Sequence, residues 1–473
     1  MNQVVILAGG HGKRMKAAIP KPMLQVLDVP MLGWVIRACE GAGLSRICVV
    51  TGYKAQYVEL YLGNRYRTAL QAEQLGTGHA VMQAEKFMQE FTDGNTLVLC
   101  GDAPFMDSET IANALKLHEA QENAVTVITA TLEQPTGYGR ILRSETGIAA
   151  IVEEKDATDA QREIHEVNSG AYWFKTKALL ELLGNLSQSN AQGEYYLTDT
   201  VGLALERGWK ASAYRSENPD VILGANTRKD LLHLNKVAQE RVLEKHMENG
   251  VNFVNTDGII IGNDVEIGAE TTILPGTILR GKTKIGAKCT IGPNCLIENC
   301  SIGDHVTLNY VQAFESEIED AVKAGPFVHI RPNSHLKNGV KIGDFVEVKN
   351  STVGEQTAIA HLTYVGDSDV GKKVNFGCGT VTVNYDGLKK QRCVIGDNCF
   401  IGCNTNLVAP VRVGDGAYTA AGSTITEDVP PEALGIARAR QVTKEGWAGP
   451  KLAAYIAKKQ KLEAAARGRE GEK

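Results

Sequence analysis

Apolar residues in the first half of the chain gather in short runs separated by amphipathic stretches. Four runs rich in Val, Ile and Leu predict buried strands of a mainly parallel sheet, at 4–7, 47–51, 96–100 and 125–130. Between them, residues 31–42 and 108–121 have helical spacing. This alternation predicts an α/β domain over residues 1–226, with helices on both faces of the sheet. Ligands of such sheets bind beyond the carboxyl ends of the strands.

A polar segment follows, with apolar residues at helical spacing. Leu231, Leu234, Ala238 and Val242 lie within residues 228–248. The spacing predicts a linker helix over residues 227–250.

The hydrophobic period then changes to six. An aliphatic residue recurs at every sixth position in two blocks of the sequence, and glycine often follows it directly. Between the two blocks the spacing slips by a residue or two. A six-residue period predicts a solenoid of short strands and tight turns, with one aliphatic side chain per turn pointing inward. We therefore expect a parallel β-helix over residues 251–434 and a tail over 435–473 that is helical from residue 451. The two blocks are Ile261, Ile267, Ile273, Leu279, Ile285, Ile291 and Ile297, and Ile395, Ile401, Leu407, Val413, Thr419 and Ile425.

Composition narrows the class of protein. The chain has 473 residues, of which 43% are hydrophobic and 22% charged, and its net charge is −5. This balance predicts a folded protein and argues against a nucleic-acid partner, which requires a basic excess. No apolar run approaches the roughly 18 residues of a membrane span, and the first run is interpreted as a strand and not as a signal peptide. The ten cysteines indicate reduced thiols in a cytoplasmic protein.

A glycine-rich loop follows the first predicted strand. Leu7, Ala8, Gly9 and Gly10 lead into basic Arg14, and Lys21 lies between two prolines. Glycines allow the backbone N–H groups to approach a polyanion, and the cations add charge, so the segment predicts a phosphate site.

The run LAGGHGKRM followed by IPKP resembles the signature of sugar-1-phosphate nucleotidyltransferases, with Lys13 where threonine is usual. QAEQLGTG at 71–78, LCGD at 99–102 and GYGR at 137–140 follow in the family's order. The resemblance implies that Asp102 and Asn226 ligate Mg²⁺, for which hard oxygen ligands are suited. It implies that UTP and the sugar nucleotide are held by Leu7, Ala8, Gly9, Gly10, Arg14, Lys21, Gln71, Gly76, Thr77, Gly139, Glu153, Asn168 and Asn226.

Candidate chemistry in the repeat region gathers between residues 329 and 390. His361 is the candidate base, because a neutral imidazole near pH 7 can accept a proton from an amine. We expect Glu347, on an earlier coil, to orient the imidazole. Off-pattern charges such as Arg331 and Lys349 are informative because a purely architectural wall has no use for them.

The segments EVKN, AHLTYVGD and NYDG resemble those of the bifunctional N-acetylglucosamine-1-phosphate uridyltransferase/glucosamine-1-phosphate acetyltransferase family. The resemblance implies a left-handed β-helix, a homotrimer with shared acetyltransferase sites, and a role in making UDP-N-acetylglucosamine for the cell wall. By it, glucosamine 1-phosphate is held by Arg331, Lys349, Tyr364, Asn375 and Lys390. Acetyl-CoA is held by Asn384, Tyr385, Cys403 (where serine is usual), Ala421, Arg438 and Lys444.

Three alternatives remain open at this point. One is a monofunctional sugar-1-phosphate nucleotidyltransferase with an architectural β-helix. The others are a non-enzymatic scaffold that binds sugar nucleotides, and acetyl transfer to another amino-sugar phosphate.

Overall fold

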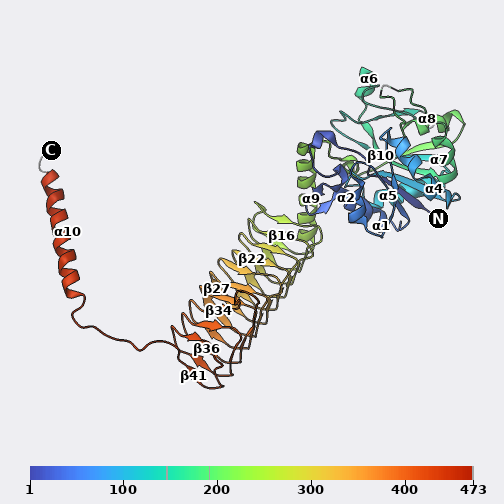
Figure 1. Cartoon of the computed structure of the whole chain (residues 1–473). Helices are drawn as coiled ribbons and strands as arrows, with labels where there is room; N and C mark the ends of the chain where they lie inside the picture. The colour runs from blue at the N-terminus through green and yellow to red at the C-terminus, as the bar shows by residue number, and fades with distance from the viewer. Residues whose placement is uncertain (145–146, 191, 471–473) are drawn as a thin grey trace. The chain divides into compact units, whose positions relative to one another are not determined.

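The computed structural model describes residues 1–144, 147–190 and 192–470. By compactness the chain divides into two units, Met1–Tyr310 and Val311–Lys473. The first contains an α/β domain, a long helix and the first coils of the solenoid, and the second contains the remaining coils (Figure 1). The domain boundaries at residues 226, 250 and 434 stay predictions.

A nine-stranded sheet forms the centre of the α/β domain, in the order β11-β7-β10-β6-β1-β4-β5, with β8 and β9 extending from β10. Only β10 runs antiparallel to both of its neighbours on this path, so the predicted mainly parallel sheet is confirmed. The strands are β1 (Gln3–Leu7), β4 (Ile47–Thr51), β5 (Arg67–Leu70), β6 (Asn95–Cys100), β7 (Val125–Thr131), β8 (Arg140–Ser144), β9 (Gly147–Val152), β10 (Glu166–Lys175) and β11 (Ala211–Arg215). A separate pair is formed by β2 (Gln25–Val26) and β3 (Val29–Pro30).

Helices cover both faces of this sheet because successive strand residues point to opposite sides. Val4 and Ile6 belong to the apolar cluster on one face, and Val5 belongs to the cluster on the other. The first face is covered by α1 (Met31–Gly41), α2 (Ala55–Leu62) and α5 (Ser108–Ala120). The second is covered by α3 (Thr77–Gln83), α4 (Glu85–Gln89), α7 (Thr176–Leu183) and α8 (Asp199–Glu206). The shorter helices are η1 (Lys13–Met15), η2 (Lys21–Met23), α6 (Asp159–Arg162) and η3 (Pro219–Ile222).

The helix α9 (Arg228–Glu248) lies within residues 227–250, where the helical spacing predicted a helix. Its first turn is closed by a capping box, in which the Thr227 hydroxyl accepts the Asp230 N–H and the Asp230 carboxylate accepts the Thr227 N–H. Leu234 and Ala238 pack into an apolar cluster with Met31 and Phe105 of the α/β domain. The helix is therefore part of that domain's packing and not a free connector.

The first coils of the solenoid form three ladders of parallel strands. The asparagine, threonine and serine strand positions point outward, while the aliphatic residues spaced by six are buried, as predicted. The ladders are β12 (Asn252–Phe253), β15 (Thr272–Ile273), β18 (Thr290–Ile291) and β21 (Thr307–Leu308); β13 (Ile260–Ile261), β16 (Ile278–Arg280) and β19 (Leu296–Glu298); and β14 (Glu266–Ile267), β17 (Lys284–Ile285) and β20 (Ser301–Ile302).

The second unit repeats the three ladders, so the fold is the predicted left-handed parallel β-helix. We call the first the Lys349 ladder: β22 (Val311–Phe314), β25 (Val328–Ile330), β28 (Glu347–Lys349), β31 (Tyr364–Gly366), β34 (Val381–Val383), β37 (Asn406–Val408) and β40 (Thr424–Ile425). The second is β23 (Glu317–Ile318), β26 (His335–Leu336), β29 (Thr352–Val353), β32 (Ser368–Val370), β35 (Cys393–Ile395) and β38 (Val411–Val413). The third, the His361 ladder, is β24 (Lys323–Ala324), β27 (Lys341–Asp344), β30 (Ala358–His361), β33 (Asn375–Phe376), β36 (Phe400–Ile401), β39 (Tyr418–Thr419) and β41 (Leu434–Gly435).

Buried hydroxyl groups close the turns between these strands. The Thr357 hydroxyl, for example, donates to the carbonyl of Gly371 on the next coil at 2.8 Å, which satisfies a backbone acceptor inside the helix. The tail contains α10 (Gly449–Glu470), as predicted from residue 451 onward; residues 471–473 lie outside the described residues. Among the described residues, no helix combines the length and the hydrophobicity needed to cross a lipid bilayer.

Candidate active sites

A cavity of about 270 Å³ opens at the carboxyl ends of β1 and β6 in the α/β domain. Its position agrees with the general rule for ligand sites in such sheets. Eight of the predicted residues line it: Leu7, Gly9, Gly10, Lys21, Gln71, Gly76, Thr77 and Asp102. The tertiary structure therefore gathers into one pocket residues that are scattered over about a hundred positions of sequence.

Gly9 has a steric reason to lack a side chain. A Cβ at this position would lie 3.0 Å from Gln71 Oε1 and 3.3 Å from the Thr51 carbonyl oxygen. The Gly9 carbonyl also accepts the N–H of Tyr53 at 3.1 Å. The loop is thus pressed against the end of β4, which leaves Gly9 and Gly10 as bare backbone at the cavity wall.

Lys21 joins the two predicted metal ligands. Its Nζ lies 2.5 Å from Asp102 Oδ2 and donates to Asn226 Oδ1 at 2.7 Å. Asn226 is held in place because its N–H donates to the Asp230 carboxylate, at 2.9 Å, in the capping box of α9. A carboxylate and an amide oxygen converging on one cation-sized point are the hard oxygen donors that fit Mg²⁺.

Gln71 and the start of α3 form the opposite wall. The Gln71 side-chain amide donates to the Gly76 carbonyl at 3.1 Å, and Gly76 has a φ of 108° that favours glycine. Thr77 begins α3, and its hydroxyl accepts the N–H of Leu197 at 3.0 Å. This fixes the turn that presents the Gln71 amide and the backbone of 76–77 to the cavity.

The predicted sugar-binding residues form a second cluster beside that cavity. The Asn168 N–H donates to the Gly139 carbonyl at 2.9 Å. The Glu153 carboxylate lies next to Gly139, because a Cβ added to this glycine would be 3.5 Å from Glu153 Oε2. The Asn168 side chain accepts the N–H of Gly170, and the Gly170 carbonyl accepts the thiol of Cys100, which lines the cavity. Burial raises the pKa of Glu153, and the charges of Asp156 and Asp199 raise it further against a hydrogen bond from Thr198.

Two of the predicted loop residues are not part of the cavity lining. Ala8 is buried, and its N–H donates to the Val50 carbonyl at 2.8 Å, so its contribution is structural in the described geometry. Arg14 lies in η1 and is exposed. Their predicted contacts with the nucleotide stay predictions.

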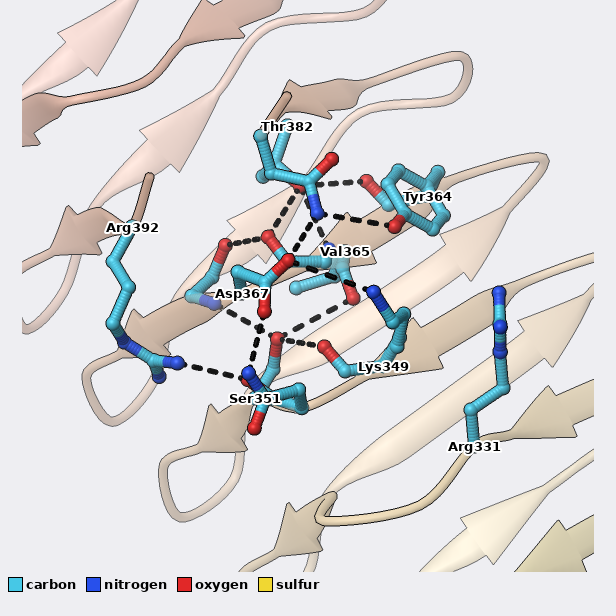
Figure 2. A network of polar contacts seen from close by, with 12 residues as sticks. Arg331, Lys349, Ser351, Tyr364, Val365, Asp367, Thr382 and Arg392 are labelled. Carbon is cyan, nitrogen blue, oxygen red and sulfur yellow. Dashed lines mark hydrogen bonds and ion pairs between the residues drawn. The ribbon is translucent and has the colours of Figure 1, made fainter. Parts of the chain in front are cut away.

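A polar network on the Lys349 ladder forms the second candidate site (Figure 2). Asp367 is buried and accepts hydrogen bonds from the side-chain amides of Asn350 and Asn384. Lys349 Nζ lies 3.7 Å from Asp367 Oδ2, and Asn384 also contacts the Tyr364 hydroxyl at 3.3 Å. Figure 2 shows Lys349 and Tyr364 pointing toward this network, with Arg331 to one side.

The charges of this network are arranged to hold an anion. Contact with the Lys349 ammonium lowers the pKa of Lys390, so two cations are held side by side. Burial raises the pKa of Asp367, but the hydrogen bonds from Asn350 and Asn384 and the charges of both lysines outweigh it, and the net shift is downward. The Asp367 carboxylate pairs with Lys349 and attracts the charge of Lys390, and one negative charge against two positive charges leaves positive charge for a phosphate.

His361 ends β30 and is exposed, with its Nδ1 3.3 Å from Asp344 Oδ1. Asp344 is the register partner of His361 on the preceding coil. Within the single chain Glu347 does not contact the imidazole, so its expected role in orienting His361 stays a prediction. Glu347 lies on a different ladder and pairs with Arg331, whose Nη1 is 2.8 Å from Glu347 Oε1. This pairing raises the pKa of Arg331, and Glu347 is in turn the register partner of Tyr364 on the next coil.

The remaining predicted residues divide between the two ladders. Asn384 belongs to the Asp367 network, and Tyr385 follows it in an exposed loop where its hydroxyl donates to the Gly387 carbonyl at 2.7 Å. Asn375 lies on the His361 ladder between β30 and β36. Cys403 and Ala421 follow β36 and β39 of the same ladder, and Arg438 lies beside Gly422.

Several residues of these sites were not predicted from the sequence, and Asp344, Asp367 and Glu194 are examples. Asp344 and Asp367 carry the hydrogen bonds that position His361 and Asn384, and Glu194 lines the nucleotide cavity. Asp344 lies seventeen residues before His361, which is one coil in this part of the solenoid. The coil length was therefore the signal that could have identified it.

Family models match both halves of the chain. Residues 3–221 match the nucleotidyl transferase family. Residues 258–287 match the hexapeptide repeat of succinyl-transferase, and residues 392–427 match the bacterial transferase hexapeptide family.

Full-length relatives contain both halves in the same order. The chain is 48% identical over 444 residues to the bifunctional protein GlmU of Acetivibrio thermocellus, covering 94% of this chain and 96% of that one. It is 49% identical over 444 residues to that of Thermoanaerobacter pseudethanolicus, with the same coverage, and 46% identical over 451 residues to that of Streptococcus agalactiae, covering 95% and 98%. The chain belongs to the family of bifunctional GlmU proteins, enzymes that combine a uridyltransferase and an acetyltransferase.

Proposed function

We propose that the second unit acetylates glucosamine 1-phosphate with acetyl-CoA, and that the α/β domain then transfers UMP from UTP to the N-acetylglucosamine 1-phosphate so formed. The products of the two reactions are CoA, UDP-N-acetylglucosamine and pyrophosphate. The order follows from the chemistry, because the product of acetyl transfer is the acceptor of the uridyl group. The convergence of Lys21, Asp102 and Asn226 in the cavity carries the uridyltransferase assignment. The Asp367 network, together with His361 on the preceding strand of the same chain, carries the acetyltransferase assignment.

In the uridyl transfer, the base of UTP lies against Gln71, Gly76 and Thr77, and its phosphates lie along Gly9 and Gly10. Asp102 and Asn226 would hold Mg²⁺, which supplies positive charge at the phosphates when it is bound. A phosphate oxygen of the sugar phosphate attacks the α-phosphorus of UTP, and the bond to pyrophosphate breaks. Lys21 and Arg14 stabilise the negative charge that develops, so the protein acts by positioning and electrostatics. Gly139, Glu153 and Asn168 orient the sugar.

In the acetyl transfer, Lys349 and Lys390 hold the phosphate of glucosamine 1-phosphate. Arg331, Tyr364 and Asn375 complete its binding. His361 accepts a proton from the sugar amine, whose nitrogen forms a bond to the thioester carbonyl carbon of acetyl-CoA. The tetrahedral intermediate collapses, the carbon–sulfur bond breaks, and CoA leaves as a thiol after protonation. Asn384, Tyr385, Cys403, Ala421, Arg438 and Lys444 hold acetyl-CoA.

An exposed apolar stripe supports the proposal of a homotrimer with acetyltransferase sites at the subunit interfaces. Phe327 and Phe345 are exposed and stack with ring centroids 5.3 Å apart, and exposed Leu362 follows His361 directly. Apolar side chains gathered on a surface are typical of a protein interface. Sedimentation equilibrium would check the assembly, with a mass of three chains expected and a monomer contradicting it. We expect the enzyme to act in the cytoplasm, where UTP and acetyl-CoA are made.

Mass spectrometry of reaction mixtures tests the two activities. Purified protein receives glucosamine 1-phosphate, acetyl-CoA, UTP and Mg²⁺, and a second tube lacks acetyl-CoA. UDP-N-acetylglucosamine formed only in the complete tube supports both reactions and their order. If the complete tube gives none while added N-acetylglucosamine 1-phosphate is still converted, the β-helix is architectural and the protein is a monofunctional nucleotidyltransferase.

A further inference from the structure

A column of side chains runs along one edge of the His361 ladder. Ile359 pairs with Phe376, Phe376 with Ile401, and Ile401 with Thr419 on successive coils. Counting two residues onward from each strand position places His361, Cys378, Cys403 and Ala421 in the same register. The hydrogen bonds between coils continue through these turns, because the N–H of Gly379 donates to the Leu362 carbonyl, that of Asn404 to Cys378 and that of Gly422 to Cys403.

Two members of this column are neighbouring thiols. Cys378 is half-buried and Cys403 is exposed, and both are free. The hydrogen bond from Asn404 N–H to the Cys378 carbonyl is 2.7 Å long, so the two turns are stacked at the ordinary strand spacing of about 4.8 Å. Disulfides form between residues whose Cα atoms are about 4.4–6.8 Å apart. The Cα spacing expected for stacked turns therefore lies within the range of a disulfide, and the bond also requires the two Cβ atoms to come within about 3.5–4.5 Å.

The position of the pair connects it with the acetyl transfer. Cys378 is one coil from His361, and Cys403 and Ala421 belong to the proposed acetyl-CoA contacts. In the proposed function the thioester lies along this edge, so a covalent bridge across the two turns alters the surface that it contacts. By contrast, Cys393 and Cys399 are buried among the coils.

We propose that Cys378 and Cys403 form a thiol modification site at which a reversible disulfide switches off acetyl transfer; this rests on the proposed function of the second unit. The oxidant is a low-molecular-weight disulfide. The Cys403 thiolate attacks one of its sulfurs and releases one thiol, and the Cys378 thiolate then attacks the Cys403 sulfur and releases the second. Two protein thiols are oxidised to one disulfide, and the small disulfide is reduced to two thiols.

Oxidised glutathione is the probe for the test, applied to the full-length protein. Peptide mapping of the treated protein is expected to find Cys378 and Cys403 cross-linked with a loss of two hydrogens. Acetyl transfer falls at least tenfold and returns with dithiothreitol, while uridyl transfer in the same sample is unchanged. Cys378→Ala retains acetyl transfer and becomes insensitive to the oxidant. Cys403 is a proposed acetyl-CoA contact, so Cys403→Ser can have a different starting activity. For this variant the measure is the ratio of acetyl transfer after oxidation to that before, and we expect a ratio of one. Cys399→Ala, a buried thiol on the coil of Cys403, stays sensitive.

Three results would overturn the proposal. They are a mixed disulfide with glutathione on Cys403 without the cross-link, a cross-link that leaves acetyl transfer unchanged, and inhibition that persists in both Cys378→Ala and Cys403→Ser. Failure of the proposed function would show in the reduced protein, as absence of acetyl transfer before any oxidant is added. That result would also overturn the proposed inhibition of acetyl transfer. A mapped cross-link would still show that the two cysteines form a disulfide.

Discussion

Lys21 and Asp102 are joined by a 2.5 Å contact between ammonium and carboxylate, at the point where Asn226 also presents its amide oxygen. The ammonium therefore occupies the position that suits a metal ion held by the same two residues. Lys21 and the proposed Mg²⁺ compete for the same two oxygen ligands. Both are nevertheless proposed to add positive charge at the phosphates. This relationship makes the two functions of Lys21 experimentally separable.

Replacing Lys21 by Met is expected to change metal affinity and catalysis in opposite directions. Divalent cation binding in the absence of UTP tightens, because the competing ammonium is gone. Uridyl transfer falls by about 10²–10³-fold, because charge stabilisation at the phosphates is lost. Calorimetric titration with Mg²⁺ and a uridyl transfer assay measure the two effects. Asp102→Asn should weaken both, and Lys177→Met, which removes an exposed lysine paired with Asp93, should change neither. Weaker metal binding in Lys21→Met would contradict the shared-ligand arrangement.

His361→Ala is expected to lower kcat of acetyl transfer by about 10²–10⁴-fold, the usual loss when a general base is removed. Uridyl transfer in the same preparation should be retained, because none of its proposed residues lies in the second unit. Separate assays of the two reactions check this. If both activities fell together in a folded protein, the assignment of the two reactions to two sites would be wrong.

Asp344→Asn tests whether Asp344, the residue that contacts the imidazole within the chain, positions it for proton transfer. Asp344 is a positioning residue, so kcat of acetyl transfer should fall by about tenfold while KM for glucosamine 1-phosphate changes little. Glu347→Gln is the matched comparison. Because Glu347 holds Arg331 and not His361, that variant should mainly raise KM. The reverse pattern of kcat and KM effects would return the orienting role to Glu347.

The sugar cluster predicts a pH dependence of uridyl transfer. Burial, with Asp156 and Asp199 nearby, raises the pKa of Glu153, so this carboxyl is protonated at a higher pH than an ordinary glutamate. Its ionised form is the better acceptor for a sugar N–H or hydroxyl. KM for N-acetylglucosamine 1-phosphate should therefore rise as the pH is lowered, with kcat less affected. In Glu153→Gln the KM should be higher at neutral pH and nearly flat over the same range. An equally steep profile in the variant would assign the titration to another group.

Stability at mildly acidic pH should depend on His118. This side chain is fully buried, its Nδ1 lies 2.9 Å from Thr126 Oγ1, and its Nε2 has no hydrogen-bond partner among the described residues. Burial, with a contribution from Lys175, lowers its pKa from 6.5 to about 4. The unfolded chain binds the proton more readily, so the stability from this group is complete above pH 6.5 and is lost as pH falls toward 4.

Between pH 7 and pH 5 this shift corresponds to about 2 kcal/mol of the free energy of unfolding. Denaturant unfolding at the two pH values measures it. In His118→Gln the difference should shrink by about that amount, whereas His233→Gln, at an exposed position, should behave as the parent chain does. An undiminished difference in His118→Gln would place the pH sensitivity in another group.

The residues themselves determined the architecture of both halves. Alternating apolar runs and helical stretches were sufficient for the α/β domain, because the periods of strand and helix are local properties of the backbone. The six-residue period was sufficient for the coils, because every sixth side chain has to be buried in the same interior. The glycine loop and the family motifs also named eight residues that line one cavity.

Only the tertiary structure decided which polar side chains meet. Lys21 and Asn226 are 205 residues apart, and α9 and its capping box bring them together. On the solenoid, neighbours are set by coil length and by which ladder a residue occupies, and the coils here are not all of equal length. Glu347 and Asp344 are only three residues apart in sequence, yet the turn between β27 and β28 directs one toward Arg331 and the other toward His361. A local pattern determines an element, but contacts between elements depend on the path of the chain around the whole coil.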